Sequence, residues 1–565
     1  MGGGRVAVLR SAVILAGLAI LALVAFVLAT LPPTPGTVHE IDSARASRTV
    51  RGAFHVHTTR SDGSRDRSGV AAAARAAGLQ FVVFTDHGDG TRPADPPEYL
   101  HGVLCLDAVE VSTTGGHYVA LGAAPSPYPL GGESAAVVED VARLGGFGIA
   151  AHPGSPRQEL AWSDWTAAID GVEWLNADSE WRDETRRSLA RAVAAYPVRP
   201  SAALATLLDR PESTLARWDA IAAVRRVVAI AGHDAHGGIG RRVEQPSSRR
   251  RIPVPSYEAS FRSFSTRVEL ERPFGGDAAD DGGALLASLK AGRFYTVVDA
   301  LATGATTLEF TARSDDGAAA QGSVLPGGGI ASFNVRAAVP DGATIVAFRN
   351  GVDIARRQAG SLEFRSGALG AYRVEVQVTG APGEPPVPWL VSNPIFRLAP
   401  VQPPTPAGSD PVIAIPASAW RIEKDQGSEG AVRAEDRSGE VVFDYRLRAG
   451  PRVSQFVALA ANLPRELAPF DAIAFTARSS SPVRISVQLR FAGDGDARWK
   501  KSVFVSSAPE ATTLRIADLR RADGPERRPD ANRATSLLLV ADLTNARPGD
   551  SGTVHLRNVR LARGG

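Results

Sequence analysis

The stretch AFHVHTTRSDG, residues 53–63, carries the residues that decide the fold of this chain. It begins with an apolar run, so we expect a strand that ends at the histidines. Because side chains alternate along a strand, His55 and His57 lie on one side of it with a single residue between them. Asp62 follows in a loop that can turn back over both imidazoles. The stretch therefore predicts a polar site at one strand end.

Short apolar runs alternate with helical stretches from here to about residue 235. The runs are FVVFT, YVALG, FGIAA, VEWLN and VVAIA, and the helical stretches are GVAAAARAAG, SAAVVEDVARLGG and DETRRSLARAVAAY. This alternation predicts parallel strands joined by crossover helices, in an α/β layer or barrel. Cys105, the only cysteine, lies in the apolar run GVLCLDAVEVS, where we expect a buried hydrophobic side chain.

Eight of the ten histidines lie between His55 and His236, and most stand beside an expected strand end. Functional residues of α/β folds collect at the carboxyl ends of parallel strands, so these side chains should converge. A single histidine in a strand is more often a hydrogen-bonded core residue than a ligand. Six of them with three carboxylates predict a metal centre. Besides His55, His57 and Asp62, its members are His87, Glu110, His117, His152, Asp234 and His236.

Imidazoles and carboxylates suit zinc, manganese or iron, whereas calcium prefers oxygen ligands alone. A divalent metal ion lowers the pKa of a bound water to about 7, which makes hydroxide available at neutral pH. The expected nucleophile is therefore metal-bound water, and the expected reaction is hydrolysis.

The order of the motifs HxHxxxxD, TDH, Glu-then-His, AHP and HDAH resembles the polymerase-and-histidinol-phosphatase (PHP) family. The segments EVSTTGGH, GRFYTVVDALA and WLVSNPI are similar to its carbaryl-hydrolase-like (CehA/McbA) branch. The resemblance covers about residues 51–398 and implies a distorted (βα)7 barrel with two or three divalent metal ions at its mouth. It assigns His55, His57, Glu110 and Asp234 to one ion, Glu110, His117 and His152 to a second, and Asp62, His87 and His236 to a third. Glu110 is then the bridging carboxylate.

Three further polar residues have more than one interpretation. Arg60, between the histidine pair and Asp62, could contact a phosphate or carboxylate of the substrate, or remain a solvated loop residue. Asn176 ends the run VEWLN and could line the site or cap the next helix. Strand alternation points His233 away from the site, so we interpret it as structural.

Residues 11–31 form an uncharged apolar run long enough to cross a bilayer as a helix. Arg5 and Arg10 precede it, which predicts a cytoplasmic N-terminus and a catalytic domain in the periplasm or outside the cell. A cleavable signal peptide is the alternative, but its apolar region usually runs to only about 7–15 residues. We therefore expect residues 1–31 to be a cytoplasmic stub and membrane anchor, followed by a linker over residues 32–49.

The catalytic domain is expected over residues 50–300, and two all-β sandwich domains follow it. Alternation with period two and the turn Asn350-Gly351 predict an Ig-like sandwich over residues 301–400. A proline-rich linker, residues 401–413, leads to a jelly-roll sandwich over residues 414–565 that faintly resembles galactose-binding domains. Its aromatic residues could form a carbohydrate platform, although such residues are usually core: Trp420, Tyr445 and Trp499.

Lysine and arginine number 63 against 60 acidic residues and are scattered, so nucleic acid is not an expected partner. We expect a membrane-anchored metal-dependent hydrolase. A phosphoester is the favoured substrate, because a cluster of divalent ions matches a substrate that gains negative charge on its oxygens. The alternatives are hydrolysis of a carbamate, ester or amide, and a non-catalytic protein that binds surfaces.

Overall fold

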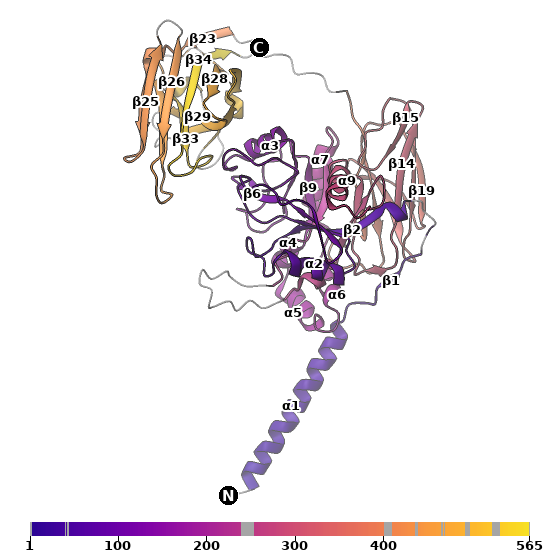
Figure 1. Ribbon diagram of the computed structural model, residues 1–565. Coiled ribbons are helices and arrows are strands. Elements are labelled where there is room, and N and C mark those ends of the chain that lie inside the picture. The colour runs from indigo at the N-terminus through magenta and orange to yellow at the C-terminus, as the bar shows by residue number, and fades with distance from the viewer. Residues whose placement is uncertain are drawn as a thin grey trace.

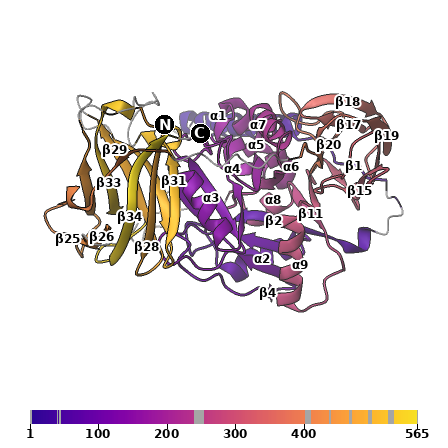
Figure 2. The same cartoon turned by 90° about the horizontal axis from the view of Figure 1, so that it is seen from above.

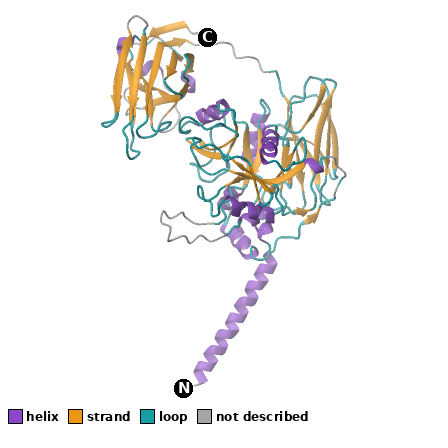
Figure 3. Ribbon diagram, viewed as in Figure 1, coloured by secondary structure: helices purple, strands orange, loops and turns teal. Residues whose placement is uncertain are grey.

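The computed structural model describes residues 3–39, 41, 45–238, 254–400, 410–435, 439–464, 467, 469–491, 498–521 and 531–563. A long helix, α1 (Gly3–Thr30), projects from the base of the folded part (Figure 1). Its segment Ala12–Thr30 is the one helix in the described residues that is long and apolar enough to span a membrane. Most of the remaining helices lie around the central strands and at the base of the folded part, and the C-terminal part is built mainly of strands (Figure 3). The apolar N-terminal helix is therefore confirmed.

A ring of strands forms the centre of the molecule. Each strand pairs with the next along the ring. A bridge between His87 and Glu110 continues the pairing, and one between Val56 and Ala235 closes the ring. Its strands are β2 (Thr49–Val56), β3 (Phe81–Phe84), β5 (Val103–Asp107) continuing into β6 (Val109–Thr113), β7 (Gly116–Leu121), β8 (Phe147–Ala150), β9 (Gly171–Asn176) and β10 (Val228–Gly232). Apolar side chains from several of these strands pack together: Phe54, Val83, Val119, Ile149 and Ile230.

The expectation of parallel strands is wrong for β7. This strand pairs antiparallel with both β6 and β8, whereas the other neighbours in the ring run parallel. Only residues 114 and 115 separate β6 from β7, which is a hairpin connection, and a parallel pair would need a crossover of a dozen residues or more. The hairpin places Glu110 and His117 on neighbouring strands.

Helices connect the strands of the ring and cover it, as the sequence predicts. Each helical stretch quoted above contains a helix, and α3 buries the apolar side of its turns through Val137 and Val141. The helices are α2 (Arg67–Ala76), α3 (Ser134–Arg143), α4 (Ala177–Asp183), α5 (Arg186–Ala195), α6 (Pro200–Ala205), α7 (Glu212–Ala222), α8 (Tyr257–Phe261) and α9 (Ala278–Lys290).

The first sandwich shares a sheet with the ring. Strand β21 pairs with β20 on one side and with β12 on the other, and β12 reaches β2 through β11. The sheet therefore runs across the expected boundary at residue 300. These strands are β11 (Ser265–Glu269), β12 (Phe294–Val297), β17 (Thr344–Arg349), β18 (Val352–Arg357), β20 (Gly370–Gln377), β21 (Leu390–Ser392) and β22 (Ile395–Arg397), with β4 (Glu98–Leu100) at the far edge.

A four-stranded sheet forms the second layer of this sandwich. Its strands are β14 (Leu308–Ser314), β15 (Gly317–Ala320), β16 (Ala331–Ala337) and β19 (Ser361–Ser366). Asn350 and Gly351 both have positive φ and join β17 to β18, so the expected hairpin is confirmed. Part of the expected linker is packed rather than free, because β1 (Gly36–Thr37) pairs with β13 (Ala302–Thr303) and Val38 is buried.

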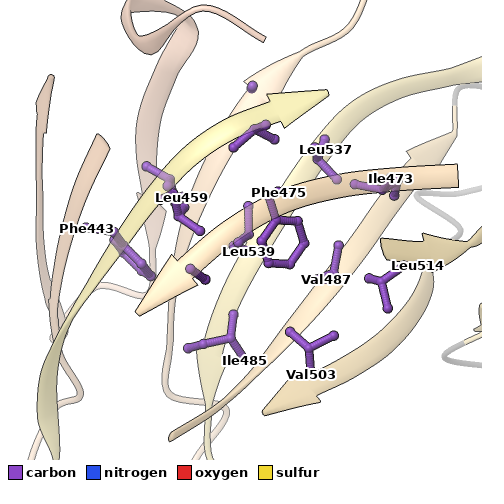
Figure 4. Packing of buried hydrophobic residues seen from close by; sticks show 14 of the residues in the cluster. Phe443, Leu459, Ile473, Phe475, Ile485, Val487, Val503, Leu514, Leu537 and Leu539 are labelled. Carbon is purple, nitrogen blue, oxygen red and sulfur yellow. The ribbon is translucent and has the colours of Figure 1, made fainter. Parts of the chain in front are cut away.

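The C-terminal part is a sandwich of two antiparallel sheets. One contains β23 (Asp410–Ala414), β25 (Glu429–Glu435), β26 (Glu440–Arg446), β28 (Ala472–Ser479), β31 (Glu510–Arg515) and β34 (Ser551–Arg563). The other contains β24 (Trp420–Lys424), β27 (Phe456–Asn462), β29 (Val483–Phe491), β30 (Arg498–Val505), β32 (Arg520–Arg521) and β33 (Ala534–Asp542). Side chains from both sheets interlock in its core, including Phe443, Phe475 and Leu539 (Figure 4).

This sandwich lies beside α3 in both views (Figures 1 and 2). The buried guanidinium of Arg484 on β29 pairs with the buried carboxylate of Asp140 on α3 at 2.7 Å. Asn545 donates to the carbonyl of Pro129, and Arg547 pairs with Asp89 at 2.9 Å. The sandwich therefore touches the loop that follows His87.

Candidate metal centre

The nine candidate ligands predicted from the sequence converge at one end of the strand ring. Eight of them fall into groups of three whose ligand atoms lie within 4.8 Å of one another. The ninth, His236, stacks on His57 with ring centroids 4.3 Å apart. The groups are His55, Glu110 and His152; His55, His57 and Asp234; His57, Asp62 and His87; and His87, Glu110 and His117.

Glu110 lies at the centre of the cluster and divides its two oxygens between different histidines. Its Oε1 lies 2.8 Å from His117 Nδ1 and 2.8 Å from His152 Nε2. Its Oε2 lies 3.2 to 3.3 Å from ring nitrogens of three other histidines: His55, His57 and His87. A carboxylate placed in this way can hold one cation on each oxygen, as the sequence resemblance implies for this residue.

The other two carboxylates contact different histidines of the cluster. Asp234 Oδ1 lies 3.1 Å from His57 Nε2 and 3.5 Å from His55 Nε2. Asp62 Oδ2 lies 3.2 Å from His236 Nε2 and 3.8 Å from His87 Nε2. Each of the three ligand sets implied by the resemblance therefore consists of residues that lie close together.

Three of the nine residues hold their backbone in the left-handed region. The φ angles are 63° at His55, 30° at His152 and 47° at Asp234. Side chains other than glycine rarely adopt this region, and such strain concentrates at functional sites. At His55 it coincides with a bulge in the pairing of β2 with β3. The chain thus deviates from regular strand geometry where it presents these side chains to the centre.

The donor set fits divalent metal ions. Four buried atoms in the cluster have no hydrogen-bond partner in the part of the chain that the structure describes: His55 Nε2, His57 Nε2, Glu110 Oε2 and His152 Nδ1. Burying polar atoms without a partner is costly, so such atoms normally bind something. Imidazole nitrogens and carboxylate oxygens together are the ligands that zinc, manganese and iron prefer.

Charges in the cluster favour a cation at the imidazoles. Burial lowers the pKa of His57, but the neighbouring carboxylates of Asp234 and Glu110 outweigh burial and raise the pKa to about 10. Burial would raise the pKa of Glu110, but the charge of His55 and hydrogen bonds with His117 and His152 hold it well below its usual range. The carboxylates therefore stabilise positive charge here, whether a proton or a metal cation carries it.

Sequence reasoning missed two carboxylates that hold the ligands in place. Glu173 on β9 accepts from His55 Nδ1 at 2.6 Å and from the backbone N–H of His152 at 2.7 Å. Asp86 accepts from the N–H and hydroxyl groups of both Thr58 and Ser61. The sequence does carry a signal for each of them. Glu173 is an acidic residue within the apolar run VEWLN, and Asp86 follows the apolar run in FVVFTD.

Arg60, for which the sequence leaves both a substrate contact and a loop position open, forms ion pairs with two carboxylates. Its guanidinium pairs with Asp95 at 2.6 Å and with Asp107 at 3.2 Å. Burial lowers its pKa, but these two carboxylates outweigh burial and raise it. Arg60 lines a surface groove with Arg67 and Leu100, and none of the nine candidate ligands lines that groove. Its positive charge is already balanced.

The remaining assignments have mixed outcomes. His233 is structural, because its ring nitrogens meet the carbonyls of Phe54 and Phe264 and the ring stacks on Phe264. Asn176 serves both roles: Oδ1 caps α4, while Nδ2 donates to Glu173 at 2.9 Å. Cys105 is a free, buried thiol in β5, as expected.

The three aromatic residues that could have formed a carbohydrate platform in the C-terminal sandwich are core residues instead. Trp420, Tyr445 and Trp499 are each at most 7% exposed and belong to the sandwich core. Their strand positions point them inward, against the opposite sheet, so they present no flat ring face to a ligand.

Comparisons with known proteins give only distant structural likenesses. No protein-family model matches the sequence, and no curated protein is significantly similar to it. A family 11 carbohydrate-binding module from Clostridium thermocellum, in complex with a mixed-linked tetrasaccharide, is 15% identical; the match covers 26% of this chain and 89% of that chain, with a TM-score of 0.21. The module TmCBM61, in complex with β-1,4-galactotriose, is 15% identical; that match covers 26% of this chain and 90% of the module, with a TM-score of 0.17. Such low scores carry no argument about ligands.

Proposed function

We propose that this chain is a membrane-anchored, metal-dependent hydrolase of the PHP family, in its CehA/McbA-like branch, and that it cleaves a phosphoester. The observation that carries the proposal is Glu110, whose two oxygens each face a different set of histidines. A carboxylate that faces five imidazoles can bridge metal ions, whereas a core residue would not need so many polar partners.

The strand ring supports the family proposal. Seven strand positions close on themselves, and the candidate ligands stand at one end of them, as expected of a distorted (βα)7 barrel with metals at its mouth. The reversed strand β7 accounts for the distortion.

Bound divalent ions would lower the pKa of a coordinated water to about 7 and stabilise charge on the substrate oxygens. The chain's own residues position that chemistry. Glu173 fixes the orientation of His55, and Asp86 holds the loop from Thr58 to Ser61 against the cluster. Positioned ligands need no reorganisation during the reaction, which is the main source of electrostatic catalysis.

Charge balance links the substrate to the number of ions. Five carboxylates belong to the centre or hold it: Asp62, Asp86, Glu110, Glu173 and Asp234. Two divalent ions with neutral imidazoles would leave one net negative charge, whereas three would leave one net positive charge. Phosphoester hydrolysis is therefore favoured by a three-ion site, which attracts an anionic substrate.

A carbamate or carboxylic ester is the second candidate. The observation that favours it is the pairing of Arg60 with Asp95 and Asp107, because the charge of Arg60 is then already balanced instead of being available to an anionic substrate. A neutral substrate would not need one.

The decisive experiment uses the purified full chain in detergent. Elemental analysis should give two or three equivalents of zinc, manganese or iron. The loaded protein is then assayed on p-nitrophenyl phosphate, bis-p-nitrophenyl phosphate and 1-naphthyl N-methylcarbamate, with Glu110→Gln purified in parallel as the control for contaminating phosphatases. A higher kcat/KM on the carbamate would replace the phosphoester proposal, and absence of both metal and activity would favour a non-catalytic surface-binding protein.

We also propose that α1 is a single-pass anchor with the catalytic part outside the cytoplasm. Protease added to intact spheroplasts should then digest the catalytic part. Protection until lysis would reverse the proposed orientation.

A further inference from the structure

The apolar helix α1 is in contact with helix α5 of the folded part. Val27 and Thr30 in the last turn of α1 are half-buried, and Pro32 is buried. Arg199, just beyond α5, donates from Nη1 to the carbonyl of Pro32 at 2.6 Å. The direction in which the chain leaves α1 is therefore tied to α5.

This contact fixes the depth of α5 if α1 spans a bilayer. The apolar run ends at Leu31, so the last turn of α1 would reach the boundary between hydrocarbon and headgroups. An element packed against that turn stands at headgroup level. Figure 1 shows α5 at the end of the folded part from which α1 projects.

The two faces of α5 differ in composition. Ala192 and Ala195 face the protein and are buried. On the opposite side, helical spacing gathers exposed residues that are basic or apolar. This stripe, which we call the α5 face, consists of Arg186, Arg187, Ala190, Arg191 and Val193, continued after the helix by Val198.

The α5 face lacks the partners that a water-exposed surface usually has. Its valines are 67% exposed at Val193 and 56% at Val198. Among the residues that the structure describes, no carboxylate forms an ion pair with Arg186, Arg187 or Arg191. Arginine with exposed aliphatic side chains is the composition of helices that lie on membranes, where the guanidinium groups meet lipid phosphates and the apolar groups enter the interface.

We propose that the α5 face binds the anionic headgroups of the bilayer that holds α1, so that the catalytic part is held in one orientation on the membrane. This inference rests on the proposed anchor and goes beyond it: α1 alone tethers the enzyme, whereas the α5 face prevents it from swinging about the tether. The occupant is a lipid surface rather than a protein, because the anchor brings this face to the headgroups in every molecule.

The test places a reporter on the face. Val198→Cys carries an environment-sensitive NBD fluorophore, and the full chain is reconstituted in nanodiscs of phosphatidylcholine with or without 30% phosphatidylglycerol. Val453→Cys, 58% exposed on the C-terminal sandwich, is the matched control. Wild type serves as the labelling blank, because Cys105 is buried.

We expect the Val198 label to shift to shorter wavelength and to be quenched by doxyl-labelled lipid in the anionic discs, while the Val453 label is unaffected. Replacing Arg186, Arg187 and Arg191 with glutamine should weaken the bound state about fivefold per arginine, and 0.5 M salt should act in the same direction. Equal quenching at both positions would overturn the proposal. So would quenching of the Val198 label that stays the same when the three arginines are replaced.

Failure of the anchor is a separate outcome. If α1 does not insert into the membrane, an alkaline carbonate wash will remove the chain from lipid vesicles. If the chain stays with the lipid but the Val198 label remains unquenched, the anchor holds and the α5 face proposal alone is wrong.

Discussion

Glu173 Oε1 accepts a hydrogen bond from His55 Nδ1 at 2.6 Å, and both side chains are buried. Because a histidine that donates from Nδ1 presents the lone pair of Nε2, the bond directs Nε2 toward Glu110 and Asp234. Carboxylate, histidine and metal commonly form such triads, in which the carboxylate orients the ring and raises its basicity.

Glu173→Gln should lower metal affinity 10- to 100-fold, because the amide keeps the size of the side chain but weakens its hold on His55. Competition with a chromogenic chelator measures this. Glu180→Gln is the matched control, since Glu180 is also buried but accepts from the backbone of Asp209 rather than from a candidate ligand. An equal loss in both variants would assign the effect to general stability.

The candidate ligands could be predicted from the sequence because each stands beside a strand. The alternation of side chains along a strand and the point where the strand ends can both be read from neighbouring residues. The supporting residues could not. Glu173 lies 118 positions from His55, and Asp86 lies 28 from Thr58, so only the arrangement of the strands in the ring brings them together. The ion pairs of Arg60 were out of reach for the same reason, since its partners Asp95 and Asp107 are remote in sequence.

The helices, the period-two strands and the Asn350-Gly351 hairpin also followed from local pattern. The choice of strand partners did not. Strand β12 reads as the last element of the α/β part, yet it pairs with β21 from the first sandwich. Such pairing depends on contacts between residues about a hundred positions apart in the chain. The alternation of apolar and polar residues does not determine which strands pair.

Glu110→Gln should remove most of the bound metal while leaving the fold intact, because one oxygen can no longer act as an anionic ligand for its set of histidines. In wild type, manganese or zinc at 100 times its Kd should stabilise the protein by about 2.7 kcal/mol. Thermal unfolding with and without metal, together with elemental analysis, checks both. A metal-dependent rise in Tm that survives in Glu110→Gln would contradict the bridging role.

Arg60→Ala should leave the KM for a phosphate ester within about twofold of wild type, because its charge is balanced by Asp95 and Asp107. Exposed ion pairs contribute only about 0.2–1 kcal/mol, and Arg92 still pairs with Asp107, so the change in stability should be small. Steady-state kinetics on p-nitrophenyl phosphate decide the matter. A tenfold rise in KM would restore Arg60 as a substrate contact.

Arg484→Met should loosen the C-terminal sandwich from α3. Burial lowers the pKa of Arg484, but Asp140 outweighs burial and raises it, so the pair is strongly favoured. Breaking a buried pair costs about 3–5 kcal/mol, although Arg143 continues to pair with Asp140 and offsets part of that cost. Calorimetry should show the sandwich unfolding at a lower temperature. Arg356→Met, on an exposed pair with Asp353, is the control and should change little.

Asp183→Asn should stabilise the protein at neutral pH and not at pH 4. Burial and the charge of Asp209 raise the pKa of Asp183 to about 6, above its value in the unfolded chain. The favourable contribution of the protonated group is therefore fully present below pH 4 and is lost as pH rises through 6. Asparagine cannot ionise, so the free energy of unfolding at pH 7.5 should rise, by an amount of the order of 1 kcal/mol. The gain is no larger because water screens a half-exposed carboxylate. Chemical denaturation of both proteins at pH 4 and pH 7.5 measures the difference. A gain of equal size at both values would show that the charge of Asp183 is not its cause.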